Sequence, residues 1–241
     1  MALAEISLPR AAAEGLRSAL PDTLAALVAE VAGIVGDPSV SEAEIVRALN
    51  RGLFAAAGAA RLPDLATEVF LPFGPGQTDA PLPADFQHGP TDAFLLPSRG
   101  QVRVLPDLAA LRRSVRYGRT GRIRCLACGA GRLFVRPAPE TAVVIEMGYY
   151  RLPRPLVAAS DKPDCLPPHL AGALLGNFAC RELFERLEEG TGDRKVQTTA
   201  YGRRYEAALA ELLALHGPVQ DEPVEIPAIA PNPWTFGEDW P

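Results

Sequence analysis

The spacing of apolar residues changes twice along this chain of 241 residues. Before Leu62-Pro63, and again after Pro167, apolar side chains recur at helical spacing. Between these points they form short or alternating runs that glycine and proline separate. A period of about 3.6 residues is typical of amphipathic helices and alternation is typical of strands. The chain is therefore predicted to have an α+β fold, with helices, a β insertion and further helices in that order.

The N-terminal segment, residues 1–62, is predicted to be helical from residue 9 onward. In PDTLAALVAEVAGIVGD the apolar residues share one face, and Gly36 begins the sequence that stops the helix. Ser41 and Glu44 have the S-x-x-E spacing of a capping box, which predicts the start of a second helix. Gly58 fits the end of that helix. The apolar face of the first helix comprises Leu24, Leu27, Val28, Val31, Ile34 and Val35.

Residues 63–155 are predicted to form an inserted antiparallel β domain with tight turns. The clearest hairpin joins Ile123–Ala127 to Leu133–Arg136 through Gly129-Ala130-Gly131, and a further strand covers Ala142–Tyr150. Within this region, PDLAALRRSVRYG is either a short helix or a turn.

Residues 156–216 are predicted to be helical again and to complete one bundle with the N-terminal segment. Pro167 and Pro168 suit a first turn, and Gly190 is expected to end that helix. A last helix runs from near Arg194 to His216.

Residues 217–241 contain six prolines and five acidic residues, and no lysine or arginine. This composition excludes a helix. Both tryptophans of the chain lie here, together with other large apolar side chains that are costly to expose. The sequence favours an extended docking arm over a simply disordered terminus, the alternative that its prolines also allow.

The composition excludes several classes of protein. A net charge of −5 argues against a chain that coats nucleic acid electrostatically. No apolar run approaches the ~20 residues of a membrane span, and the N-terminus lacks the pattern of a signal peptide. We expect the protein to stay in a reducing cytoplasm, at least until assembly, with its four cysteines unpaired.

Cys125 and Cys128 have the C-x-x-C spacing of half a zinc ribbon or of a redox pair. A zinc site needs four ligands, and neither Cys165 nor Cys180 supplies a second C-x-x-C pair. Both sulfurs also fall in a predicted strand and its turn, where positions three apart point to opposite faces. The sequence favours two small buried thiols, with zinc as the main alternative, and we predict no metal site.

Arginines dominate the middle of the β domain, where the only acidic residue among them is Asp107. Three interpretations remain open: contacts with another subunit or partner, a solvated surface, and binding to DNA phosphates. The first is favoured, because aromatic platforms for bases are scarce and the C-terminal arm supplies complementary acids. The arginines are Arg99, Arg103, Arg112, Arg113, Arg116, Arg119, Arg122, Arg124, Arg132 and Arg136, and Arg112, Arg113, Arg116, Arg119 and Arg122 are the predicted contact residues.

Catalytic motifs are lacking. There are three histidines, none beside an obvious nucleophile, and no G-x-S-x-G, phosphate loop or H-E-x-x-H. Glu140, Asp161 and Asp164 are predicted to be isolated, solvated loop carboxylates. We predict no enzyme activity and no cofactor.

Five segments in this order resemble the head–tail adaptor family of tailed bacteriophages, which includes tail tubular protein A. The similarity covers roughly residues 22–216, and the C-x-x-C is not part of it. Its closest matches are Leu82–Phe86, Gly131–Pro139, Tyr149–Arg151 and Tyr205–Leu209. The segments are SEAEIVRALNRGLFAAAG, LPDLATEVFLPFGPGQTDAPLPADF, GRLFVRPAPETAVVIEMGYYRLPRPL, LPPHLAGALLGNFACRELFE and YGRRYEAALAELLAL.

The resemblance implies a structural protein of the virion, assembled in the host cytoplasm. Its copies, commonly twelve, would form a ring beneath the portal that extends the DNA channel, seals the filled head and anchors a tail or nozzle protein. Genomic DNA would pass through without sequence-specific binding. We expect the arm to dock into the portal, with PVEIPAI adding an edge strand. The expected docking residues are Val224, Ile226, Ile229, Trp234, Phe236 and Trp240.

The alternative function is a zinc-stabilised nucleic-acid-binding regulator that uses Cys125, Cys128 and the arginines. Near-stoichiometric zinc in the pure protein would favour it over the adaptor.

Overall fold

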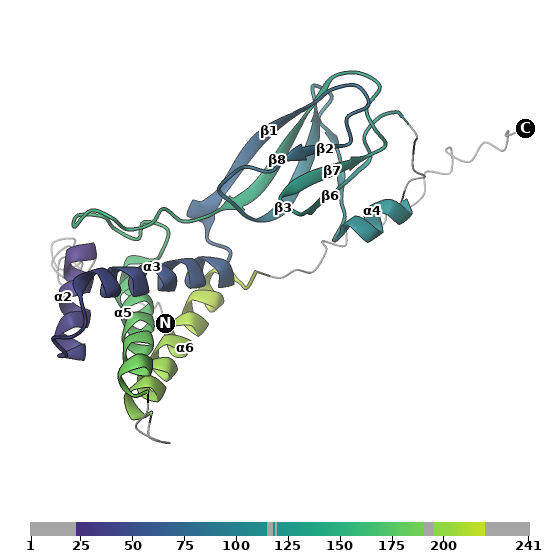
Figure 1. Cartoon of the computed structure of the whole chain (residues 1–241). Helices are drawn as coiled ribbons and strands as arrows, with labels where there is room; N and C mark the ends of the chain where they lie inside the picture. Colours follow the sequence, from purple (N-terminus) through teal and green to yellow (C-terminus); the bar gives the residue numbers. More distant parts are fainter. Residues whose placement is uncertain (1–22, 115–117, 119, 190–194, 220–241) are drawn as a thin grey trace, which may run out of the picture. The chain divides into compact units, whose positions relative to one another are not determined.

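Figure 1 shows the computed structural model, which describes residues 23–114, 118, 120–189 and 195–219. Helices and mostly antiparallel strands confirm the predicted α+β class. The helices are α2 (Leu24–Val35), α3 (Glu42–Ala59), α4 (Leu108–Ser114), α5 (Pro168–Leu187) and α6 (Val196–His216), with a 3-10 helix at Pro63–Leu65. The strands are β1 (Ala66–Phe73), β2 (Asp79–Pro81), β3 (Phe86–Leu96), β4 (Gly100–Gln101), β5 (Arg103–Val104), β6 (Cys125–Gly129), β7 (Arg132–Arg136) and β8 (Val143–Arg151).

The chain divides into two compact units, which we call the helical unit and the β unit. Strands β1, β3 and β8 each contribute residues to both. The described residues of the helical unit are 23–68, 84–89, 149–189 and 195–219, and those of the β unit are 69–83, 90–114, 118 and 120–148.

Both N-terminal helices begin at caps. Thr23 accepts a hydrogen bond from the amide of Ala26 at the start of α2, and Gly36 ends α2 with a left-handed φ of 62°. The predicted capping box of Ser41 and Glu44 is present at the start of α3. These local signals were readable from the sequence because each cap bonds within one helical turn.

The predicted end of α3 at Gly58 is wrong. The helix continues through Gly58 to Ala59, and the next residue, Ala60, is extended with φ −118°. Ala60 forms an isolated antiparallel bridge with Pro218, 158 positions later in the chain. This distant pairing directs the chain out of the helix, so no left-handed glycine is needed there.

One hydrophobic core holds the helical unit together, and α5 contacts α2, α3 and α6 within it. Leu27, Leu49 and Leu174 are fully buried in this core. A Cβ added at Gly52 on α3 would lie 3.1 Å from the side chain of Phe178 on α5. The glycine therefore lets α3 and α5 approach closely. Residues of both helical segments, before residue 66 and after residue 155, belong to this core.

Two four-stranded sheets contain the strands, in the orders β1-β8-β3-β4 and β2-β7-β6-β5. The predicted hairpin is present as β6 and β7, with Ala130 and Gly131 at φ 49° and 71° in its two-residue turn. Contrary to the antiparallel prediction, β5 pairs with β6 in parallel. Two parallel neighbouring strands need a crossover connection between them. Here that connection contains α4, so the segment that the sequence predicted as either a short helix or a turn is a helix.

The C-terminal helices start near their predicted positions. Pro168 is the first residue of α5, which ends at Leu187, and Gly190 and Arg194 lie outside the described residues. The Glu188 carboxylate accepts hydrogen bonds from the amides of Gln197 and Thr198 at 2.9 and 3.2 Å. The end of α5 thereby caps the start of α6.

Candidate functional site

The C-x-x-C pair lies in β6, whose two faces are both covered. Cys125 is buried beside Leu105 and Leu111, whereas Cys128 is only half-buried, so the prediction of two buried thiols holds for Cys125 alone. Burial raises the pKa of Cys128 to about 12. A thiol with such a pKa stays protonated at neutral pH and is a poor nucleophile.

The other cysteines do not complete a metal site with this pair. Burial raises the pKa of Cys165 to about 11 and that of Cys180 to about 12. The Nε2 atom of His169 is 3.7 Å from Oε1 of Glu211. Within the described ranges, no three His, Cys, Asp or Glu side chains are grouped so as to hold a metal ion.

Two segments that carry the family resemblance meet inside the helical unit. The Tyr149 hydroxyl is 2.9 Å from Oδ1 of Asp85, and the Leu152 amide is 2.6 Å from the Asp85 carbonyl. The ring of Phe86 stacks on Tyr149 at 5.6 Å, and His88 stacks on Tyr150 at 4.5 Å. No local sequence pattern predicts this contact, because Asp85 and Tyr149 are 64 positions apart.

The loop between β8 and α5, residues 152–166, is fixed to α3 by one asparagine. The Asn50 side chain accepts from the Leu156 amide at 2.7 Å and donates to its carbonyl at 2.9 Å. Leu156 is buried, while the next residue, Val157, is 79% exposed. The loop therefore holds one apolar side chain in the core and presents another to solvent.

Asp161 organises the same loop and is not the isolated carboxylate that the sequence predicted. Its Oδ2 atom accepts from the amides of Val157 and Ala158, each at 2.8 Å. These hydrogen bonds lower the pKa of Asp161. Its carbonyl accepts from the Leu24 amide at 2.8 Å, so the loop also satisfies a free amide at the start of α2. Asp164 and Glu140 are exposed, as predicted.

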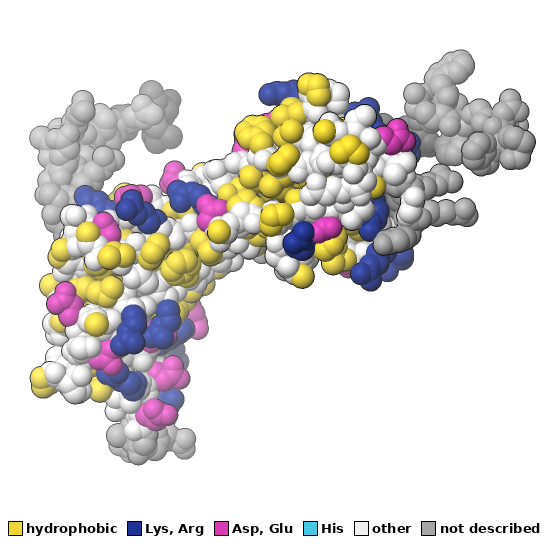
Figure 2. All heavy atoms as spheres, turned by 45° about the horizontal axis from the view of Figure 1, so that its top comes forward, with side chains coloured by type: hydrophobic (Ala, Val, Ile, Leu, Met, Phe, Trp, Pro, Cys, Tyr) yellow, Lys and Arg dark blue, Asp and Glu magenta, His cyan; other side chains and the backbone are white. Residues whose placement is uncertain are grey.

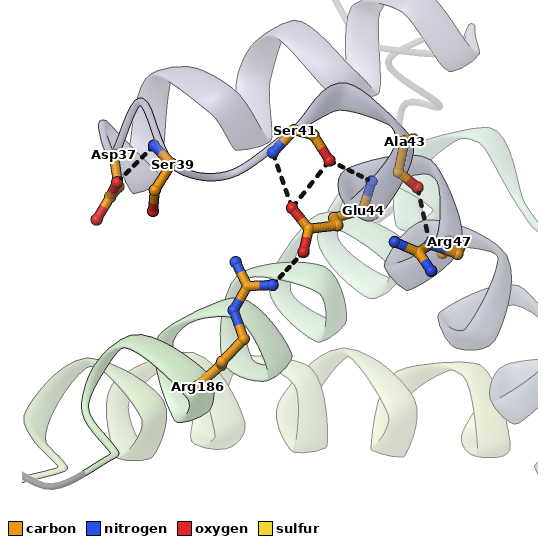
Figure 3. Close-up of polar contacts among 7 residues, drawn as sticks. All are labelled: Asp37, Ser39, Ser41, Ala43, Glu44, Arg47 and Arg186. Carbon is orange, nitrogen blue, oxygen red and sulfur yellow. Dashed lines mark hydrogen bonds and ion pairs between the residues drawn. The ribbon is translucent and has the colours of Figure 1, made fainter.

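A charged groove of about 210 Å³ lies between α3 and α5. Figure 3 shows the Glu44 carboxylate between Ser41 of the capping box and Arg186 of α5. The Ser41 amide and the Arg186 guanidinium together hold the pKa of Glu44 at about 2. Beside them, Nε of Arg51 is 3.0 Å from Oε2 of Glu182. The charges are paired across the two helices, which indicates a structural role.

Several exposed arginines of the β unit form no ion pair with an acidic residue that the structure describes. Arg132 bonds to Asp79 at 2.5 Å. Of the predicted contact residues, Arg112, Arg113 and Arg122 are exposed, and Arg116 and Arg119 lie outside the described residues. Figure 2 shows dark blue side chains on the β unit, with some magenta ones among them, and a mixture of both charges over the helices. The other exposed arginines without an ion pair to a described acid are Arg99, Arg103 and Arg124.

A more apolar pocket of about 570 Å³ lies in the helical unit. Four prolines line it, with Cys165 and His216 among the remaining lining residues. His216 is the last residue of α6, so the pocket lies where the C-terminal segment leaves the helix. The prolines are Pro63, Pro163, Pro167 and Pro168.

All six predicted arm residues lie outside the described residues: Val224, Ile226, Ile229, Trp234, Phe236 and Trp240. The preceding residues are well fixed, because the Val219 amide donates to the Ala59 carbonyl at 2.9 Å. Among the helices described, none is both long and apolar enough to cross a bilayer.

Comparison with known proteins identifies a family that matches most of this chain. The model of the family described as SU10 adaptor protein matches residues 22–226, most of the chain. No curated protein matches. The matched range includes both the helical and the β unit and the contact between Asp85 and Tyr149.

Proposed function

Because the chain belongs to the SU10 adaptor protein family, a family of phage adaptor proteins, we propose that it builds the head–tail junction of a tailed phage. In this proposal about twelve copies form a ring beneath the portal, which extends the DNA channel, seals the filled head and anchors the tail. The match over residues 22–226 is the observation that carries the proposal. The role is structural and involves no catalysis.

The two compact units suit an adaptor, which must bind different partners. The helical unit has a single hydrophobic core and would contact the portal. The β unit would face the tail or nozzle protein. Its exposed arginines, Arg112, Arg113 and Arg122, would contact a neighbouring copy or partner, together with Arg116 and Arg119. DNA would pass through the ring without sequence-specific contacts.

The C-terminal arm would dock into the portal through its large apolar side chains, above all Trp234, Phe236 and Trp240. Truncation tests this role. The cut must follow Val219, because Gly217, Pro218 and Val219 hydrogen-bond or pair with the end of α3 and Arg61. Deletion of residues 220–241 should leave the unfolding transition unchanged and abolish portal binding. Portal binding at full strength by the truncated protein would refute the docking role.

A further inference from the structure

Strand β1 is a long open edge. It has eight residues and lies at one end of the sheet order β1-β8-β3-β4, so no described strand pairs with its outer side. The other terminal strands, β2, β4 and β5, have only three, two and two residues. Short edges offer little to a further strand, whereas a long one presents a row of unpaired amides and carbonyls.

The sequence of β1 gives this edge little protection against pairing. ATEVFLPF contains one charged residue, the exposed Glu68, and no lysine or arginine. Its one proline is Pro72 near the end, and Phe70 is 57% exposed. Lysines, prolines and bulges are the usual means by which proteins block pairing at an edge. Such an edge fits an added strand from a partner.

The C-terminal segment has the pattern that such an added strand needs. Between Glu222 and Trp234, its prolines are Pro223, Pro227, Pro231 and Pro233, all at odd positions. In an extended strand, alternate residues direct their amides to opposite sides, and proline is tolerated where its nitrogen faces away from the partner. All amides of the even-numbered residues 224–232 are therefore available on one side.

The side chains follow the same alternation. Val224 and Ile226, with the alanines at 228 and 230, would share one face of the strand. Ten extended residues span about 33 Å, enough to cover the roughly 26 Å of β1.

We propose that residues 223–232 of one copy add a strand to the β1 edge of a neighbouring copy. The inference rests on the proposed ring, in which each subunit presents one surface to the next in a head-to-tail contact that closes. Val219 is fixed to Ala59, and only three residues separate it from Pro223. The β1 edge of the neighbour must therefore begin within about 13 Å of Val219. Val224, Ile226 and Ile229 would then contact the neighbouring copy instead of the portal, and residues 234–241, with Trp234, Phe236 and Trp240, remain free to dock into the portal.

Two isoleucine-to-proline variants form a matched pair. Ile226→Pro removes an amide on the pairing side, whereas Ile229→Pro removes one on the side that already carries the prolines. In unlabelled full-length protein, Phe70 is replaced by the photo-crosslinker p-benzoylphenylalanine. This protein is mixed with ¹⁵N-labelled full-length protein, and the mixture is assembled with portal. Mass spectrometry then identifies the crosslinked peptides, and native mass spectrometry reports the assembly.

We expect crosslinks from position 70 of unlabelled chains to residues 223–232 of labelled chains. They should be lost when the labelled chain carries I226P and persist at wild-type yield with I229P. The inference would be overturned if position 70 crosslinked only to its own chain or only to the portal. It would also be overturned if I226P and I229P reduced the crosslinks between chains equally. If rings form without tail crosslinks, the strand exchange is wrong and the adaptor function stands. If no ring forms with portal, both are wrong.

Discussion

The Tyr149 hydroxyl donates a 2.9 Å hydrogen bond to the Asp85 carboxylate, which lies 64 positions earlier in the chain. Tyr149 is 5% exposed, and Asp85 lies at the surface. Since each residue belongs to a segment that resembles the adaptor family, this contact joins two family motifs within the helical unit.

Tyr149→Phe removes this hydrogen bond and keeps the ring. We expect it to lower the free energy of unfolding by about 1 kcal/mol. Burial, followed by the bond to Asp85, raises the pKa of Tyr149 to about 12 from 10.0. The stabilisation should therefore be complete below about pH 10 and be lost as pH rises toward 12. Urea unfolding across this range measures it. Tyr150→Phe is the control, because it removes a hydroxyl from the neighbouring tyrosine, whose ring stacks on His88. The prediction would be contradicted if the difference in unfolding free energy between wild type and Y149F did not change with pH.

Glu44→Gln should destabilise the protein at neutral pH. The pKa of Glu44 is lowered from 4.5 to about 2 by the Ser41 amide and then by Arg186, so its folded-state stabilisation is present above about pH 4.5. The difference in unfolding free energy between wild type and E44Q should shrink as pH falls from 4.5 to 2. Urea titrations at several pH values test this. Glu42→Gln, also in the first turn of α3, controls for loss of charge near the helix dipole. If the unfolding free energies of E44Q and E42Q depended on pH in the same way, the capping box and Arg186 would not stabilise the fold through Glu44.

Asn50→Ala leaves the buried amide and carbonyl of Leu156 without their side-chain partner. The expected cost is about 2 kcal/mol of unfolding free energy. Chymotrypsin should also cleave the loop faster after Leu156, which the wild-type protein keeps buried. Asn177→Ala is the control, because Asn177 is half-buried and its side chain donates to the Ala173 carbonyl of its own helix. A cost below about 0.5 kcal/mol for N50A would show that the loop is held by other contacts.

Local sequence signals predicted the elements well. The capping box of Ser41, the hairpin turn at Ala130 and the end of α6 at Gly217 all depend on residues a few positions apart. What the sequence missed depends on distant partners. Ala60 pairs with Pro218, and α3 ends at Ala59 and not at Gly58 as the sequence predicted.

At the candidate site, too, the contacts between residues far apart in the sequence were not predicted. The roles of Asn50 and Asp161 come from backbone groups that the loop of residues 152–166 brings to them, and no local pattern encodes such contacts. The two-residue strand β5 is too short to show alternation, so its parallel pairing with β6 was not predictable. The predicted arm residues lie outside the described part, and their docking stays a prediction.

The cysteine pair gives a direct test of the alternative function. Because no further His, Cys, Asp or Glu completes a metal site with this pair among the described residues, we expect far less than one zinc per chain in the pure protein. The double variant Cys125→Ser, Cys128→Ser should bind portal as the wild type does. Stoichiometric zinc by elemental analysis, with unfolding of the protein on chelation, would instead favour the zinc-stabilised regulator.

Negative-stain electron microscopy of the full-length protein mixed with its portal tests the adaptor role most directly. We predict an additional ring of density on one end of the portal, coaxial with its channel, that is absent when residues 220–241 are deleted. The adaptor role would be contradicted if portals without added density were seen beside monomers of this chain, with both proteins at concentrations well above those at which assembly occurs in the host.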